Sequence, residues 1–136
     1  MIYRERINGI TKHSLKYFEK HIDKIGKIQS ITAYHIVSSK QGCKQANVRI
    51  SIKGINGTIV LGGLSWGYHG EGSRGLSQVF HKCSISDIIP FTNVLGVFNW
   101  NSKKKTNSRL LLWSISISKN KTVITIKHNQ IKDIVK

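Results

Sequence analysis

The sequence predicts one α+β domain over residues 1–136, with an antiparallel sheet of about six strands and helices to one side. Three observations carry this prediction. An early segment repeats apolar residues at helical spacing, several later segments alternate apolar and polar residues as strands do, and an Asn-Gly pair marks a hairpin. At 136 residues the chain is long enough for one hydrophobic core.

Residues 11–25 are predicted to form an N-terminal amphipathic helix. Thr11 or Asn8 can cap its start, and Gly26 stands where a glycine commonly follows a helix. The apolar side chains recur at spacings of three and four, so they share one stripe: Leu15, Phe18, Ile22 and Ile25. This stripe is expected to face the core.

Two hairpin strands follow a first strand predicted at 28–38. Residues 47–53 alternate, with one apolar set and one polar set: Val48, Ile50 and Ile52 against Arg49, Ser51 and Lys53. Asn56-Gly57 predicts a type I′ turn, which needs positive φ at both central residues. The return strand is predicted at 58–61.

The second half is predicted to begin with a short helix and continue as strands. Residues 74–83 have a helical apolar side, and Ser73 is placed to cap the helix start. Strands are expected at 94–100, 109–118 and 122–128. In the middle one, one face is apolar and the other is serine: Leu111, Trp113, Ile115 and Ile117 against Ser114, Ser116 and Ser118.

The charge balance predicts an anionic partner. Twenty-two Lys and Arg stand against six Asp and Glu, a formal net charge of +16, which attracts polyanions and anionic small molecules. Codon usage of an AT-rich genome is the alternative source of this excess. No apolar run is long enough for a membrane span, and the start lacks a signal-peptide pattern. Cys43 and Cys83 do not form a disulfide framework pattern, so a cytoplasmic protein is expected.

A glycine-rich segment over residues 61–76 is the strongest candidate site. It holds half of the twelve glycines, follows a strand pattern and leads into a helix pattern. Glycine permits positive φ and close approach, and free N–H groups at a helix start bind anions. The letters match neither a Walker P-loop nor a complete dinucleotide-binding unit.

In the ligand-binding interpretation, Gly70, Gly72 and Arg74 hold phosphate, with Ser73 at the helix start. The remaining candidates take other parts of a nucleotide. Trp66 or Tyr68 stacks on a base, His69 and Glu71 read ribose or base edges, and Arg109 adds charge from elsewhere in the chain. In the structural interpretation, Trp66 and Tyr68 pack into the core and the glycines only turn the chain.

The order Trp66-Gly67-Tyr68-x-Gly70-x-Gly72-x-x-x-Leu76 resembles a motif of small, mostly uncharacterised proteins of phages and bacterial mobile elements. Ser73 stands where that pattern has proline, and Ser77 where it has alanine. The likeness covers residues 64–77. Small basic proteins of this origin often block host defence, and some act as sponges for the cyclic nucleotide signals of bacterial immunity. The resemblance therefore implies an anti-defence role in the host cytoplasm.

The leading functional hypothesis is a non-enzymatic protein that sequesters a nucleotide-type ligand. A homo-oligomer is expected, because so small a domain needs shared walls to enclose a ligand. The alternatives are a nucleic-acid binder that uses a basic sheet face and the loop Lys103–Lys105, or a protein inhibitor of a host defence enzyme. No catalytic group, metal or cofactor is assigned, since no nucleophile or ligand set has a supporting motif.

Overall fold

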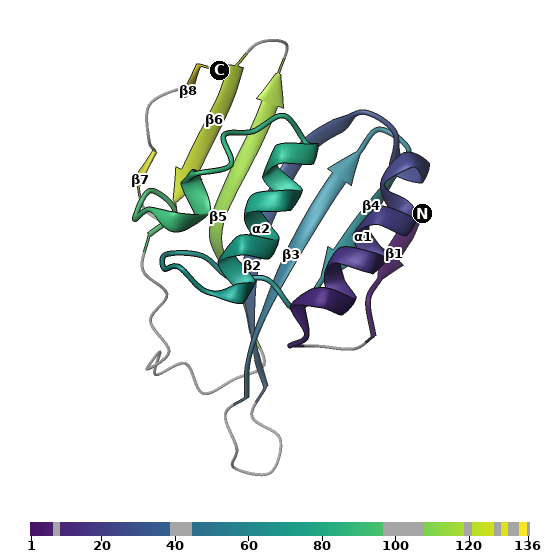
Figure 1. The fold of residues 1–136 in the computed structure, drawn as a ribbon, viewed down its shortest axis with the longest axis horizontal. Coiled ribbons are helices and arrows are strands. Elements are labelled where there is room, and N and C mark those ends of the chain that lie inside the picture. The colour runs from purple at the N-terminus through teal and green to yellow at the C-terminus, as the bar shows by residue number, and fades with distance from the viewer. Residues whose placement is uncertain are drawn as a thin grey trace.

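A computed structural model describes residues 1–6, 9–38, 45–96, 108–118, 121–126, 129–130 and 134–135. These residues form one eight-stranded sheet and two α-helices, which lie side by side on the same face of the sheet (Figure 1). The other face has no helix of the described chain over it (Figure 1). The predicted α+β class, with a largely antiparallel sheet and helices to one side, is therefore confirmed.

The elements follow one another in a simple order. The bounds are β1 (Ile2–Arg4), α1 (Thr11–Ile25), β2 (Ile28–Ser38), β3 (Gln45–Gly54), β4 (Gly57–Leu61), α2 (Glu71–Lys82), the 3₁₀ turn η2 (Ile89–Phe91), β5 (Ser108–Ser118), β6 (Lys121–Ile126), β7 (Asn129–Gln130) and β8 (Ile134–Val135). The sheet order is β1-β4-β3-β2-β5-β6-β7, with β8 also on β6. β1 pairs with β4 in parallel, and the other pairs are antiparallel. β7 and β8 have two residues each, so six strands carry most of the sheet.

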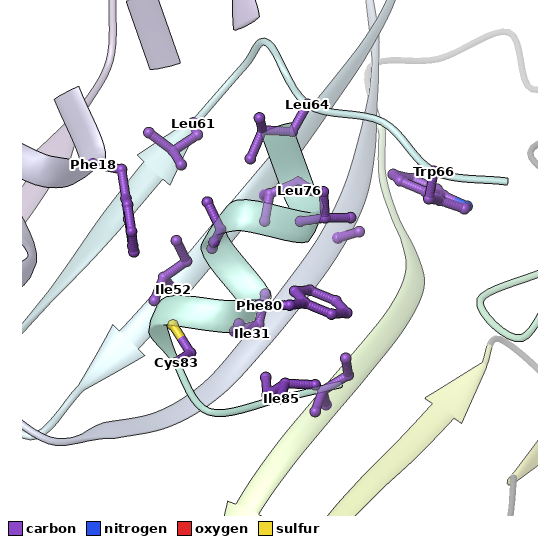
Figure 2. Packing of buried hydrophobic residues seen from close by; sticks show 14 of the residues in the cluster. Phe18, Ile31, Ile52, Leu61, Leu64, Trp66, Leu76, Phe80, Cys83 and Ile85 are labelled. Atoms are coloured by element: carbon purple, nitrogen blue, oxygen red, sulfur yellow. The ribbon is translucent and has the colours of Figure 1, made fainter. Parts of the chain in front are cut away.

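The hydrophobic core fills the space between the sheet and the two helices (Figure 2). Alternate residues of the central strands point into it and are fully buried: Ile31, Ala33, Ile50, Ile52, Ile59, Leu61, Trp113 and Ile115. Phe18 of α1 and Phe80 of α2 cover them from the helix side (Figure 2). This alternation is the predicted one for β3, and it leaves the intervening residues on the open face.

The hairpin between β3 and β4 is present, but its turn differs from the prediction. Gly54 pairs with Gly57, so the central residues are Ile55 and Asn56, and neither Asn56 nor Gly57 has a positive φ. A type I′ turn is therefore wrong. The two glycines meet a different demand, since a Cβ on Gly54 would lie 2.2 Å from the Ile25 carbonyl oxygen and one on Gly57 would lie 2.8 Å from the Met1 carbonyl oxygen. Close backbone packing requires them.

The helix caps also differ. α2 begins at Glu71 from an extended Gly70, without a side-chain cap, so Ser73 lies inside the helix rather than capping it. At α1 the cap position is Ile10, and the Thr11 hydroxyl instead donates to the Gly63 carbonyl oxygen at 2.6 Å. Asn8 lies outside the described residues. Gly26 ends α1 with a φ of 74°, as predicted.

Two strand predictions need correction. Residues 92–95 form bends and turns rather than the start of a strand at 94–100, and 97–100 lie outside the described residues. In β5 a register shift opposite Ala33 and Tyr34 moves Leu111 out of line with Trp113. Leu111 is therefore 46 % exposed and lies on the open face, instead of sharing the core face with Trp113. A β-bulge is not visible in the alternation of the letters.

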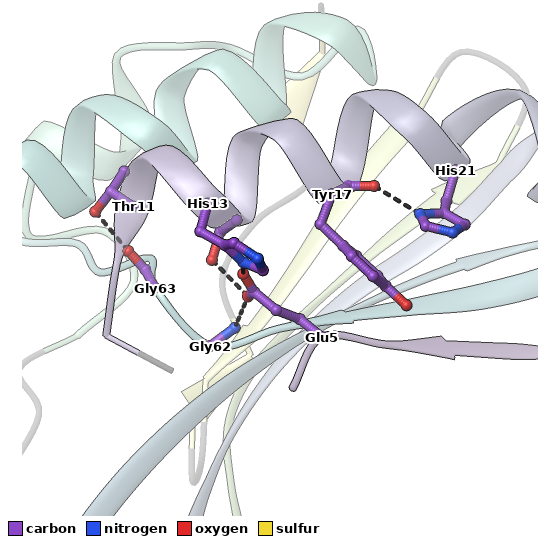
Figure 3. Close-up of polar contacts among 8 residues, drawn as sticks. Glu5, Thr11, His13, Tyr17, His21, Gly62 and Gly63 are labelled. Carbon is purple, nitrogen blue, oxygen red and sulfur yellow. Dashed lines mark hydrogen bonds and ion pairs between the residues drawn. The ribbon is translucent and has the colours of Figure 1, made fainter. Parts of the chain in front are cut away.

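A buried carboxylate fastens α1 to the sheet (Figure 3). The Glu5 side chain follows β1, is fully buried, and accepts hydrogen bonds from the Ser14 hydroxyl at 2.6 Å and the Gly62 backbone N–H at 2.9 Å. His13 Nδ1 contacts its second oxygen. Because these partners face the helix side, Glu5 is kept off the open face that Arg4, its neighbour in sequence, lines.

Candidate functional site

The glycine-rich loop between β4 and α2 is folded closely onto its own side chains. A Cβ on Gly70 would lie 2.2 Å from the Tyr68 ring, and one on Gly72 would lie 2.2 Å from the Ser65 hydroxyl oxygen. A Cβ on Gly75 would lie 2.5 Å from Thr11, where α2 packs against α1. Gly67 has a φ of 92°, which favours glycine. Packing and one turn therefore account for these glycines.

The two aromatic residues of this loop have different environments. Trp66 is 8 % exposed, lies edge-on to Trp113 at 5.4 Å between ring centroids, and donates from Nε1 to the Gly96 carbonyl oxygen at 3.2 Å. Tyr68 is 55 % exposed, and its hydroxyl is 2.9 Å from the Ser65 hydroxyl. Trp66 is thus a core residue, and Figure 2 shows it with the other buried side chains. Tyr68 instead offers an accessible ring beside the start of α2.

The other predicted residues of the loop do not gather around one cavity in the described structure. His69 stacks on Phe91 at 4.9 Å with an interplanar angle of 5°. Glu71 and Arg74 are exposed on the first turn of α2, whereas Ser73 is fully buried and its hydroxyl has no hydrogen-bond partner among the described residues. Arg109 lies in β5 opposite Ile36, and its side chain is outside what the structure describes, as are residues 103–105.

The open face of the sheet presents a second candidate site. A shallow hollow of about 420 Å³ lies on it, across β1, β4, β3, β2 and β5. Its lining combines hydroxyl groups, a guanidinium and apolar groups: Ile2, Arg4, Thr32, Tyr34, Ser51, Thr58, Val60 and Leu111. The volume is within the range of sites that hold a nucleotide-sized group.

Three cationic side chains of the described residues lie on this open face. Arg4 lines the hollow, and Arg49 and Lys53 flank Ser51 on β3, opposite in direction to the buried Ile50 and Ile52. Burial lowers the pKa of the Arg49 guanidinium from its ordinary value, while Tyr34 and Glu5 oppose that shift. An arginine remains charged at neutral pH even so, because its ordinary pKa lies far above neutrality.

Every carboxylate in the described part of the chain lies on the helix side. Glu5 bonds to α1, Glu19 and Asp23 belong to α1, Glu71 to α2, and Asp87 lies 3.5 Å from His81 of α2. The open face is therefore positive without a described anion on it, whereas the helix side carries both signs.

The sequence predicts only some of the residues that lie on the open face. The alternation of β3 predicts Arg49, Ser51 and Lys53 on one face, but no local pattern places Arg4, Thr32 and Tyr34 beside them. The order of strands in the sheet supplies that information.

The described residues hold neither a metal cluster nor a membrane-spanning helix. No three His, Cys, Asp or Glu side chains among them are grouped closely enough to hold a metal ion. Of the helices described, none has the length and apolar character that a membrane crossing needs.

Known proteins give no guide to these two surfaces. No protein-family model matches this chain, and no curated protein or solved structure matches it either. Any assignment of function must therefore come from the geometry of the molecule.

Proposed function

We propose that this protein binds nucleic acid along the open face of its sheet, without turnover. The observation that carries the proposal is the separation of charge: Arg4, Arg49 and Lys53 stand on that face, and all described carboxylates stand on the other side. A polyanion approaching the sheet meets attraction without local repulsion. The formal net charge of +16 adds long-range attraction.

The remaining groups of the open face also suit a nucleic-acid backbone. Phosphate and sugar oxygens are contacted in complexes mainly by Arg, Lys, Ser, Thr and Tyr side chains. Thr32, Ser51 and Thr58 line the hollow beside Arg4. Such a surface holds a strand by its backbone and reads little of the base sequence, so binding depends strongly on salt.

Fluorescence anisotropy with labelled duplexes over a range of salt concentrations tests the proposal. We expect the triple variant Arg4→Gln, Arg49→Gln, Lys53→Gln to bind more weakly at low salt. On duplex DNA, the slope of log K against log salt should become shallower by about 0.9 for each phosphate that the variant no longer neutralises.

The matched control removes the same number of charges from the helix side. Lys12, Lys16 and Lys20 are exposed on α1, and their triple replacement by Gln should change affinity and slope much less. Equal effects of the two triple variants, or no binding by the wild type, would refute binding by the sheet face.

Sequestration of a nucleotide-type ligand at the glycine loop is a second candidate function. Two observations favour it: α2 starts without a side-chain cap, and the buried Ser73 hydroxyl has no hydrogen-bond partner among the described residues. Arg74 is exposed on the same first turn, and the accessible ring of Tyr68 lies against Gly70, which precedes that turn. With the motif resemblance, this arrangement supports an anti-defence sponge of phage origin.

A thermal-shift panel separates the two functions. Cyclic and linear nucleotides should raise the melting temperature if the loop is the site, and Arg74→Ala should then lose about 1.5–3 kcal/mol of binding free energy, the scale of a charged hydrogen bond. Stabilisation by duplexes alone, fading with salt, assigns binding to the sheet face. A panel without any shift would leave a protein partner as the better explanation.

A further inference from the structure

Hydroxyl side chains form ordered rows across the open face. Thr32 of β2 pairs in register with Ser51 of β3 on one side and with Ser114 of β5 on the other. Two residues along, Ser30 pairs with Lys53 and with Ser116 in the same way. Neighbouring strands lie about 4.8 Å apart and rows two residues apart lie about 6.7 Å apart, so the hydroxyl groups of these two rows form a regular array together with Lys53.

These hydroxyl groups keep hydrogen-bonding capacity for a partner. Thr32 Oγ1 and Ser114 Oγ are 3.1 Å apart, so one of them donates to the other. Each hydroxyl has one donor and two acceptor positions. After their mutual bond, the pair still offers one donor and three acceptors to a bound molecule. A lysine or arginine offers donors alone.

The balance of donors and acceptors on this face distinguishes an RNA backbone from a DNA backbone. Phosphate oxygens accept hydrogen bonds and do not donate, so donors suffice to bind them, whereas a ribose 2′-hydroxyl both donates and accepts. Among the side chains that the structure describes on this face, the hydroxyl groups outnumber the cations: Ser30, Thr32, Ser51, Thr58, Ser114 and Ser116 against Arg4, Arg49 and Lys53. A surface with surplus acceptors among its cations suits a backbone in which hydroxyl groups stand beside the phosphates.

The aromatic residues of the open face indicate whether the bound nucleic acid is single-stranded or double-stranded. Single strands are held by bases stacked on exposed aromatic rings. Tyr34 is the aromatic residue of the hollow, and it is 6 % exposed, so its ring offers no stacking platform on the described part of this face. An A-form duplex instead displays its 2′-hydroxyls along a wide, shallow minor groove, which a broad sheet face can reach.

We infer that the sheet face prefers double-stranded RNA to DNA, with the row Ser51–Thr32–Ser114 contacting 2′-hydroxyls and Arg4, Arg49 and Lys53 contacting phosphates. The inference rests on the proposed nucleic-acid binding and adds the class of nucleic acid. It assigns the discrimination to neutral side chains and the bulk of the affinity to the cations. The two contributions are separable by mutation.

The test compares duplexes of one sequence and about 16 base pairs, the span that shape-reading RNA-binding domains cover, as RNA and as DNA, together with the single-stranded RNA. Anisotropy titrations at constant salt give the ratio of affinities. We expect wild-type protein to bind the RNA duplex about tenfold more tightly than the DNA duplex, the effect of one or two neutral hydrogen bonds. The double variant Thr32→Val, Ser114→Ala should lower that ratio to about two, because it weakens binding of the RNA duplex more than binding of the DNA duplex.

Two control variants accompany the test. Ser86→Ala removes a hydroxyl after α2, on the helix side, and should leave the ratio at its wild-type value. Thr32→Ser retains the hydroxyl and should keep the preference in the Ser114 wild-type background. Circular dichroism and urea unfolding of each variant show whether its fold is intact, and Ser51→Ala provides a second site if Thr32→Val fails to fold.

The outcomes separate this inference from the proposed function. Absence of binding to every nucleic acid would refute both. Equal binding of RNA and DNA, or equal weakening of both by the hydroxyl variants, would refute RNA preference and leave nucleic-acid binding in place. Tighter binding of the single strand than of the RNA duplex would refute the duplex assignment.

Discussion

The two faces of this sheet use the same alternation of residues for opposite purposes. Ile50 and Ile52 of β3 are completely buried under the helices, while Arg49, Ser51 and Lys53 form the open face. On the covered face, shape decides which residue is allowed, as in the packing of the central isoleucines against the helices. On the open face, the side chains share a positive charge or a capacity to form hydrogen bonds. The covered face therefore explains stability, and the open face is the better place to seek a partner.

The glycine loop belongs with the covered face in this comparison. Its glycines meet Tyr68, Ser65 and Thr11 at distances that exclude a Cβ, and Trp66 is part of the core. These contacts supply a structural reason for a motif that the sequence alone associates with ligand binding. Substitutions in the loop test whether its residues stabilise the fold.

The largest effect is expected for Trp66→Ala. Removal of a large buried aromatic side chain typically costs about 3–5 kcal/mol of the free energy of unfolding, because a cavity remains. The variant would lack the edge-on packing against Trp113 and the bond to Gly96. Urea denaturation measures the change, and Tyr68→Ala, at an exposed ring, should cost far less. A small effect of Trp66→Ala on the free energy of unfolding would contradict the packing role assigned to this indole.

An intermediate effect is expected for Gly70→Ala. The new methyl group would meet the Tyr68 ring, and displacement of that exposed ring should cost about 1 kcal/mol of stability. In the double variant with Tyr68→Ala the obstacle is absent, so the cost of Gly70→Ala should nearly vanish in a double-mutant cycle. Persistence of the full cost in the double variant would mean that Gly70 serves something other than the tyrosine.

The smallest effect is a pH dependence of stability from His35. Burial lowers the pKa of this imidazole in the folded state below its ordinary value of 6.5. Below about pH 6.5 the unfolded chain therefore binds the proton first, and the free energy of unfolding falls as the pH is lowered. Above that pH the contribution of neutral His35 is fully present.

Thermal unfolding between about pH 7.5 and 5 measures this dependence, since that range brackets the unfolded-state pKa. His35→Gln should flatten the acid side of the curve, whereas His81→Gln, at an imidazole that is 80 % exposed, serves as the control. An unchanged acid slope in His35→Gln would show that other groups cause the fall in stability.

Local periodicity was predictable from the sequence, whereas spatial neighbours were not. The helix at 11–25, the strand at 28–38 and the alternation of β3 follow from spacing alone, so they were accessible. The bulge that turns Leu111 outward depends on the register between β5 and β2, and no short stretch of sequence holds that information. The same limit applies to the candidate site. Arg4, Thr32 and Ser114 are far apart in sequence, and only the order of strands brings them to one face.

Part of the positive charge of the open face depends on the register of a single short strand. β1 has three residues, and Arg4 and the Glu5 that follows it point to opposite sides of the sheet. A slip of β1 by one residue would exchange these directions, placing a carboxylate on the open face and a guanidinium in the interior. The three partners around Glu5 oppose that slip. The buried acid thus acts as a register lock, and one anion hidden beneath α1 preserves the full positive charge of the opposite surface.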